Sequence, residues 1–357
     1  MRAIAGLYGF VAAAALLLWG VLAGLEHAAG GPADRTLIVF NWGDYLDPSL
    51  LQAFEAETGI RVVLETFDSN EAMLAKIRQG GTPYDVAVPS EYALSRMIAE
   101  GLVRPLDPAL LPNLKNLDPR FLNLPFDPGN RYSVPYFWGT VGIAYNREAL
   151  GEGAIRSWND LWDPRFRDSI LLIDGVREVI GLGLQSLGYS LNDTDPVHLA
   201  EAKARLDALK PNVRAIVGDE IKFLLAGEEA PIGVVWSGDA AEVIDENDAF
   251  DYVIPEEGSN LWFDSLVIPT TARNVAGAHA FINFLLDAEV AAQNTEYILY
   301  STPNRAAMAL LPPEIRDDRR FYPDDATLRR LEVYRDLGRR TLAAYSELYM
   351  AFKMHRK

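Results

Sequence analysis

Trp262 and Asp264 are the residues whose types and spacing most directly suggest a chemistry. If the apolar segment 261–269 is extended, side chains two positions apart lie on the same face, so the indole and the carboxylate are neighbours. The face of an indole attracts a cation, and a carboxylate accepts charge-assisted hydrogen bonds from an ammonium group. A carboxylate within an apolar strand also needs a partner. The pair therefore predicts a site for an organic amine.

Tryptophan and acid occur together in two further segments, Trp42-Gly-Asp-Tyr45 and Trp236-Ser-Gly-Asp239. Each follows an apolar run of strand type, and Gly43 would let a ligand approach the backbone closely. Each also has a structural interpretation, since Trp42 could pack in the core and Asp239 could cap a helix. Three such combinations in one chain predict an aromatic cage that is lined by acids and holds an amine.

Four other residues are candidates for the same cage. Ser90 and Tyr92 follow a strand-like run, Glu178 stands near the start of a helical run, and Tyr300 precedes a Ser-Thr-Pro-Asn turn. Taken alone, Ser90 would be read as a helix cap and Glu178 as an acid that complements a helix dipole. Taken with the tryptophans, they place acids and aromatic rings at the ends of several predicted elements.

Composition describes a well-packed and strongly acidic protein. The chain has 357 residues, enough for about two domains, and 49% of them are hydrophobic. A formal charge of −17 argues against nucleic acid as a partner and favours a cationic ligand, although solubility alone would also explain it. The chain has no cysteine, which excludes disulfides, thiolate catalysis, cysteine-bound zinc and lipid attachment through cysteine.

Catalytic and metal-binding patterns are missing from the sequence. The four histidines have no triad or metal-ligand spacing, and there is no phosphate-binding loop or Gly-x-Ser-x-Gly elbow. Tyr297 and Tyr300 are not adjacent, as a ferric-ion site would require. We therefore expect no catalytic residue, no metal and no cofactor. Glycoside hydrolysis is kept as the enzymatic alternative, because paired carboxylates perform it and tryptophan stacks on sugars.

The first thirty residues resemble an export signal. The run from Leu7 to Leu25 is almost wholly apolar, follows Arg2, and is followed by the small residues Ala28-Ala-Gly30. Residues 1–30 are therefore predicted to be a signal peptide that is cleaved. Because the run is close in length to a minimal membrane span, an uncleaved N-terminal anchor is the alternative. Either way, the rest of the chain is exported.

Strands and helices alternate after the leader. Segments 35–41, 60–65 and 85–89 have strand character, and segments 47–57 and 70–79 have helical spacing between them. This alternation predicts a doubly wound, mainly parallel sheet of the α/β class. Ligands of such sheets bind at the carboxyl ends of the strands, where Trp42 and Ser90 both fall.

A second lobe of the same kind is predicted after a crossover at 138–146, and segment 261–269 crosses back. The expected elements are a strand at 169–174, helices at 177–187 and 196–209, a strand at 231–236, a helix at 275–286 on the first lobe and one long helix at 326–352. We place residues 36–141 and 263–310 in the first lobe and residues 142–262 and 311–357 in the second. Two lobes joined by more than one crossover predict a hinged clamp that closes on its ligand.

The chain resembles the bacterial periplasmic spermidine/putrescine-binding proteins, the type II solute receptors of polyamine ATP-binding-cassette (ABC) importers. The resemblance runs from about Leu37 to Leu337. It is carried by these motifs: Phe40 to Tyr45, Phe54 to Ile60, Ser69-Asn-Glu71, Tyr84 to Ser90, Asn116-Leu-Asp118, Pro125 to Pro128, Arg177-Glu-Val179, Trp262 to Leu266 and Thr302-Pro-Asn304.

The resemblance implies a two-lobed receptor in the periplasm, without catalysis or cofactor, that binds a polyamine and meets a membrane permease. It also implies a monomer and no nucleic-acid partner. The family's ligand contacts carry over to this chain in three groups. Its aromatic walls match Trp42, Tyr45, Tyr92, Trp236, Trp262 and Tyr300. Its polar contacts match Ser90 and the Gly43 backbone, and its acids match Asp44, Glu178 and Asp264.

Three positions depart from a single branch of that family. Gly175 stands where the spermidine-preferring branch has a second aspartate, and Tyr334 stands near the place of a glutamine. Asp239, by contrast, matches an acid of the putrescine-preferring branch. The choice between putrescine and spermidine therefore stays open. So do two alternatives: a receptor for another cationic or zwitterionic amine, such as a choline-like compound, and a membrane-tethered polyamine sensor.

Overall fold

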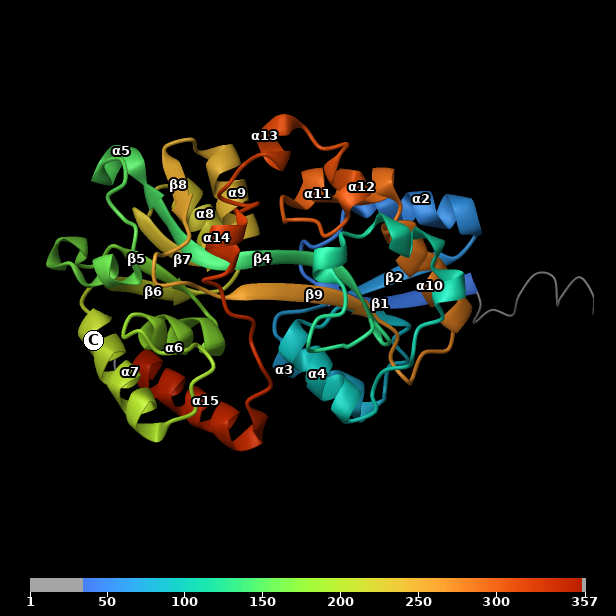
Figure 1. Cartoon of the computed structure of the whole chain (residues 1–357), viewed down its shortest axis with the longest axis horizontal. Coiled ribbons are helices and arrows are strands. Elements are labelled where there is room, and N and C mark those ends of the chain that lie inside the picture. The colour runs from blue at the N-terminus through green and yellow to red at the C-terminus, as the bar shows by residue number, and fades with distance from the viewer. Residues whose placement is uncertain (1–34, 355–357) are drawn as a thin grey trace, which may run out of the picture.

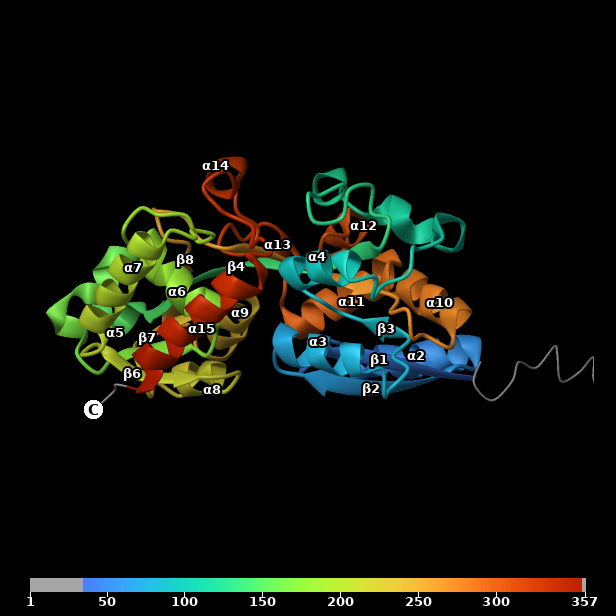
Figure 2. The ribbon, with the colours of Figure 1, turned by 90° about the horizontal axis from the view of Figure 1, so that it is seen from below.

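Two α/β lobes, joined by long strands, make up the part of the chain that the computed structural model describes, residues 35–354 (Figure 1). The predicted leader at 1–30 lies outside these residues. Figure 2, seen from below, shows the connecting strand β4 (Ser133–Asn146) passing from one lobe to the other. The α/β class with two sheets, predicted from the alternating pattern, is confirmed.

The sheet of the first lobe has the order β2-β1-β3-β9-β4. Its first three strands run parallel, while β9 is antiparallel to both β3 and β4. Its strands besides β4 are β1 (Thr36–Trp42), β2 (Arg61–Phe67), β3 (Val86–Ala87) and β9 (Leu261–Val267). Its helices are α2 (Pro48–Thr58), α3 (Asn70–Gln79), α4 (Glu91–Ala99), α10 (Val275–Leu285), α11 (Ala288–Ile298) and α12 (Arg305–Met308), and the short helix α13 (Pro313–Arg316) follows α12.

Local sequence explains where the first helices begin and end. Asp47 caps α2 by accepting from the Ser49 N–H, and Pro48 occupies the first turn, where no donor is needed. Ser69 caps α3 in the same way, and Gly80 ends that helix in the left-handed conformation with φ +66°. Both helices were predicted within one residue of their observed bounds.

The second lobe repeats the plan with β6-β5-β7-β4, and β8 pairs with the other edge of β4. Here β5 is parallel to β6 and β7, and β4 is antiparallel to β7. The strands are β5 (Ile170–Ile173), β6 (Val213–Val217), β7 (Ile232–Trp236) and β8 (Phe250–Val253). The helices are α5 (Arg147–Leu150), α6 (Val176–Gln185), α7 (Pro196–Leu209), α8 (Ile221–Ala226) and α9 (Ser237–Glu246). The sequence did not predict β6, β8, α8 or α9.

Strand β4 belongs to both sheets, and every residue in it is buried. Its first part pairs with β9 as far as Thr140, and from Val141 onward it pairs with β7. The register shifts between Pro135 and Phe137, where proline cannot donate to a ladder. A strand that changes partners in this way connects the lobes without a loop. The lobe boundaries given above remain a prediction.

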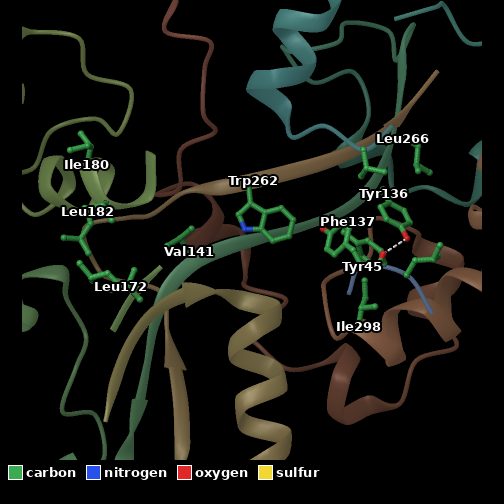
Figure 3. Close-up of a cluster of buried hydrophobic side chains, with 14 of the residues drawn as sticks. Tyr45, Tyr136, Phe137, Val141, Leu172, Ile180, Leu182, Trp262, Leu266 and Ile298 are labelled. Carbon is green, nitrogen blue, oxygen red and sulfur yellow. Dashed lines mark hydrogen bonds between the residues drawn. The ribbon is translucent and has the colours of Figure 1, made fainter. Parts of the chain in front are cut away.

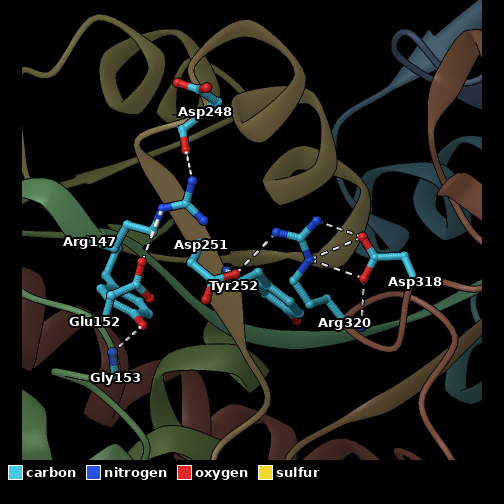
Figure 4. Close-up of polar contacts among 9 residues, drawn as sticks. Arg147, Glu152, Gly153, Asp248, Asp251, Tyr252, Asp318 and Arg320 are labelled. Atoms are coloured by element: carbon cyan, nitrogen blue, oxygen red, sulfur yellow. Dashed lines mark hydrogen bonds and ion pairs between the residues drawn. The ribbon is translucent and has the colours of Figure 1, made fainter.

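A third connection runs through the C-terminal part of the chain. Beyond α13, Arg320 donates to Asp251 of β8 at 3.1 Å and forms an ion pair with Asp318 at 2.6 Å (Figure 4).

Three short 3-10 helices in the Pro- and Asn-rich middle each begin with proline: Pro108–Leu110, Pro112–Asn116 and Pro119–Phe121. Two further 3-10 helices, Trp158–Trp162 and Pro164–Phe166, belong to the second lobe.

The predicted single helix at 326–352 is wrong. Two helices stand there, α14 (Asp325–Leu328) and α15 (Gly338–Met354), and α15 packs on α6 and α7. Between them, Glu332 accepts from the Leu261 N–H and donates its own N–H to Ser259. Because these backbone groups bond to another segment, they are not available to a helix. In residues 35–354 no single helix is long and apolar enough to cross a membrane, and only α10 with α11, bent by 74°, passes as a pair.

Candidate functional site

Strand β9 presents Trp262 and Asp264 on one face, as their spacing predicted. The Trp262 indole lies over Gly139 of the paired strand β4, where any side-chain carbon would overlap it. The Trp262 ring meets Tyr300 at 5.4 Å between centroids, and Tyr300 meets Tyr45 at 5.2 Å. Trp262 and Tyr45 also belong to one buried cluster (Figure 3). The three rings form a continuous aromatic wall between the two acids that are described next.

Asp264 is buried and holds two hydrogen bonds. The Tyr45 hydroxyl donates to one carboxylate oxygen at 2.8 Å, and the Ser90 hydroxyl donates to the other at 2.7 Å. Asn70 fixes Ser90 by donating to its hydroxyl at 3.0 Å. Burial nevertheless raises the pKa of Asp264 to about 6, because the two donors compensate only part of the lost hydration. Ser90 stands at the N-cap position of α4, as the capping interpretation expected, but its side chain makes no cap bond, because its hydroxyl donates to Asp264 instead.

Asp239 is the corresponding acid of the second lobe. It lies inside the first turn of α9, which begins at Ser237, so the alternative that it caps the helix is also wrong. The Tyr300 hydroxyl donates to Oδ1 at 2.8 Å, while the buried Oδ2 finds no hydrogen-bond partner among the described residues. Burial raises the pKa of Asp239 to about 7. The Tyr300 ring lies directly on Gly238, which leaves no room for a side chain there.

We call Tyr45, Ser90, Asp239, Trp262, Asp264 and Tyr300 the interlobe site. Both of its carboxylates lose hydration and regain only part of it from tyrosine and serine hydroxyls. A cation placed beside them would stabilise their ionised forms. No group of three or more His, Cys, Asp or Glu side chains within residues 35–354 is placed to hold a metal ion. Two partly compensated carboxylates beside aromatic rings are an arrangement that suits an organic ammonium group.

The turn after β1 contributes in a different way from the one expected. The Trp42 indole N–H donates to the Val88 carbonyl at 3.0 Å, and its ring packs 4.5 Å from Phe67. This indole is thus held in the core of the first lobe. Gly43 and Asp44 are exposed, and Asp44 adopts φ +47°. The Asp44 carboxylate lies 4.0 Å from the ammonium of Lys222, which belongs to the second lobe.

Glu178 lies at the other end of the second lobe, near the start of α6. Its carboxylate folds back over Gly175, so a side chain at 175 would overlap it. Tyr334 lines a small pocket with Glu178, and the Arg177 guanidinium stacks on the Tyr334 ring at 4.2 Å. Burial raises the pKa of Glu178, and the charge of Glu71 in the first lobe adds to this, whereas Arg177 opposes it.

Tyr92 faces the same end from the first lobe. Its ring meets Tyr334 edge-on at 6.2 Å, and its hydroxyl donates to Glu71 at 3.4 Å. Trp236 ends β7 half-buried and packs against the cores on both sides of the second sheet. The structure therefore brings most of the predicted residues together in two groups, the interlobe site and the Glu178 end, while the Gly43–Asp44 turn faces Lys222. Trp42 and Trp236 belong to neither group and pack against the hydrophobic cores.

Sequence reasoning missed Glu91 and Lys222. The carboxyl of Glu91 is fully buried and accepts from the Phe263 N–H at 2.9 Å, while its other oxygen has no partner among the described residues. Burial raises the pKa of Glu91 to about 8, so the group is mostly protonated at neutral pH. In the sequence, an acid just after Ser90 reads as a dipole-compensating residue. A lysine within a short apolar run such as 221–226 reads as a solvent-exposed position.

Comparison with known proteins gives one consistent result. A model of the bacterial extracellular solute-binding proteins matches residues 49–322. The chain is 43% identical over 343 residues to the spermidine/putrescine-binding periplasmic protein of Salmonella typhimurium, covering 96% of this chain and 98% of that one. It is 34% identical to a putrescine-binding periplasmic protein of Pseudomonas aeruginosa, covering 95% and 96%. A solved protein of Listeria monocytogenes, provisionally described as a spermidine/putrescine ABC transporter, superposes with a TM-score of 0.87 at 59% identity, covering 90% and 100%.

Proposed function

We propose that this chain captures a polyamine between its lobes and delivers it to an ABC importer. The chain belongs to the bacterial extracellular solute-binding proteins and, among them, to the spermidine/putrescine-binding members. A polyamine is a flexible alkane chain that carries ammonium groups. The observation that carries this proposal is the pair of buried acids, Asp264 and Asp239, set on either side of the Trp262 and Tyr300 rings.

Each part of the ligand has a matching part of the interlobe site. One ammonium is received by Asp264, whose orientation is fixed by Tyr45 and Ser90. A second is received by the Oδ2 of Asp239, which has no hydrogen-bond partner in residues 35–354. The methylenes between them lie against the Trp262 ring. A charge-assisted hydrogen bond contributes ~1.5–3 kcal/mol and a desolvated cation–π contact ~2 kcal/mol, so a few of each give micromolar or tighter affinity.

Closure of the lobes is part of this function. Several contacts already cross between the lobes, among them Tyr300 to Asp239 at 2.8 Å, Lys222 to Asp44 at 4.0 Å, and Arg96 to Asp336 at 2.8 Å. A ligand that binds Asp264 in one lobe and Asp239 in the other favours the closed state, because its affinity for that state is higher. The lobe assignment of residues 36–141 with 263–310, and of 142–262 with 311–357, belongs to this proposal.

The rest of the proposal concerns location and partners. The exported chain works in the periplasm, either free after cleavage of residues 1–30 or held to the inner membrane by them, and meets the permease of the importer there. It acts as a monomer and catalyses no reaction. Its relatives are named for solute binding, which supports a receptor over an enzyme.

Calorimetric titration tests the proposal directly. The purified protein, freed of bound ligand by mild unfolding and refolding, is titrated with putrescine, spermidine, spermine and choline. We expect micromolar or tighter binding of at least one polyamine and weaker binding of choline, which lacks a second charge. Asp264→Asn should weaken polyamine binding at least tenfold, while Asp317→Asn, at an exposed acid paired with Arg316, should not. The absence of heat with all three polyamines would refute the proposal.

A further inference from the structure

Lys222 is a buried ammonium at the outer edge of the interlobe site. Its side chain is only 9% exposed, and its nitrogen lies 2.8 Å from the carboxylate of Glu242 on the adjacent helix α9. The same nitrogen lies 4.0 Å from Asp44, which is 84% exposed and belongs to the first lobe. A lysine needed only to join α8 to α9 would pair with Glu242 alone. Lys222 is placed between acids of both lobes.

The acids around Lys222 include one from the interlobe site. Asp239 and Asp44 both act electrostatically on the Lys222 ammonium, beside its hydrogen bond to Glu242. The Asp219 carboxylate faces the Gly43 backbone, and a side-chain carbon built there would lie 3.9 Å from it. The Lys222 ammonium thus contacts one carboxylate from each lobe, Glu242 and Asp44, and feels the charges of Asp239 and Asp219. The Oδ2 of Asp239 stays buried without a hydrogen-bond partner among the described residues. That oxygen marks the place where a ligand nitrogen and Lys222 would approach each other.

We propose that Lys222 is a tethered ammonium that serves as a resident cation of the binding site and limits how many ligand nitrogens the site accepts next to Asp239. This inference rests on the proposed function and extends it to ligand selection. A diamine that spans Asp264 and Asp239 ends before Lys222. A longer polyamine that continued past Asp239 would bring a further ammonium towards Lys222. Two like charges that approach each other in a poorly hydrated site repel strongly.

Lys222 thereby acts as a specificity residue rather than a source of affinity. The acids near it would otherwise attract a third ligand nitrogen, because they carry more negative charge than one ammonium neutralises. With Lys222 present, that place is taken by a group that cannot dissociate. Its removal should therefore let a triamine provide the missing charge, which a diamine is too short to do.

The test compares Lys222→Met with wild type by calorimetric titration with putrescine, spermidine and spermine. Methionine keeps the length of the apolar stem and removes the charge. We expect the affinity for spermidine and spermine, relative to that for putrescine, to rise about tenfold. Lys203→Met, which removes a surface lysine paired with Asp207 on α7, should leave that ratio unchanged. So should Lys222→Arg, which keeps the charge.

In a second variant we expect the ratio of spermidine affinity to putrescine affinity to change in the opposite direction. Glu242→Gln removes the acid nearest to Lys222 and leaves its ammonium less compensated, so the same ratio should fall below the wild-type value. An unchanged ratio in both variants, or an equal change for diamine and triamine, would overturn the role of Lys222 while polyamine binding itself stands. A wild-type protein that binds none of the three amines would refute the proposed function, and with it this role.

Discussion

Asp239→Asn should make the ligand-free protein more stable and should lower its affinity for the polyamine. Asp239 is 8% exposed as a residue, accepts one hydrogen bond from Tyr300 and leaves its second carboxylate oxygen without a partner among the described residues. Its folded pKa of about 7, against an ordinary value of 3.8, means that ionising it in the fold is costly. At 1.36 kcal/mol for each pH unit, the cost at high pH is roughly 4 kcal/mol as an upper bound.

The expected gain is smaller than that bound. Asparagine still accepts from Tyr300, but its amide also needs a partner, and Lys222 loses the attraction of one nearby anion. We therefore expect the free energy of unfolding at pH 8 to rise by about 1–2 kcal/mol, with an increase in Tm of a few degrees. At pH 5 the wild-type carboxyl is protonated in the folded state, and the two proteins should differ little.

The sign of the pH dependence follows from the raised pKa of Asp239. The unfolded chain releases this proton near pH 4 and the folded chain near pH 7, so between these values the folded state binds more protons. Stability of the wild type should therefore fall as pH rises through that window, and the slope should be shallower in Asp239→Asn. Urea unfolding at pH 5 and pH 8 measures both. A variant less stable than wild type at pH 8 would refute the reasoning.

Ligand binding provides an independent reading of the same group. A polyamine that pairs with Asp239 stabilises its ionised form, so binding at pH 6.5 should release protons. Titrations in two buffers with different ionisation enthalpies measure that release, which should be smaller in Asp239→Asn. Polyamine affinity of the wild type should rise from pH 5 to pH 8, as Asp264 and Asp239 become ionised. Proton release that is equal in both proteins would show that the ligand does not pair with Asp239.

Three further predictions follow from the geometry. Trp262→Leu keeps an apolar side chain but loses the ring, so polyamine affinity measured by calorimetry should fall by more than ~1 kcal/mol; unchanged affinity would mean that the ring only packs. Gly139→Ala places a carbon against the Trp262 ring and should lower the free energy of unfolding by ~2 kcal/mol or more. Gly81→Ala, at a position with no neighbouring atom within 4 Å, should not lower it. Equal urea midpoints for the two variants would contradict this. Arg96→Ala removes the ion pair with Asp336 that joins the lobes, and should expand the ligand-free protein in small-angle X-ray scattering, with no change once polyamine is bound. Expansion in both states would refute the idea that this ion pair helps to hold the ligand-free lobes together.

Much of the fold could be predicted because local signals and tertiary structure agree in the first lobe. Helix α3 begins after Ser69 and ends at Gly80, and both residues act locally as caps. The failures lie where long-range pairing decides. The helix expected at 326–352 is broken at residues 329–337, where the backbone of Glu332 bonds to Ser259 and Leu261. No local sequence pattern predicts these bonds. Strands β6 and β8 are short and sit at sheet edges, so their periodicity is weak.

The candidate site divides in the same way. The spacing of Trp262 and Asp264 was enough to place both on one face, because a strand has only two faces. The sequence could not distinguish Asp239 as a site acid from Asp239 as a helix cap, since a Trp-Ser-Gly-Asp segment before a helix fits both. Lys222 was out of reach altogether. Its significance depends on burial and on acids that lie far from it in the sequence.

The two acids of the interlobe site are unequal, and this inequality suggests how the protein selects and holds its ligand. Asp264 has both oxygens engaged, by Tyr45 and Ser90, and these two bonds offset part of the rise that burial causes in its pKa, to about 6. Asp239 has one engaged oxygen and a higher pKa. A ligand ammonium therefore gains most at Asp239, the acid that lies across the lobe junction and near Lys222. Binding energy is largest where it also joins the lobes, so a ligand whose nitrogens reach both acids is favoured over a shorter one that reaches Asp264 alone.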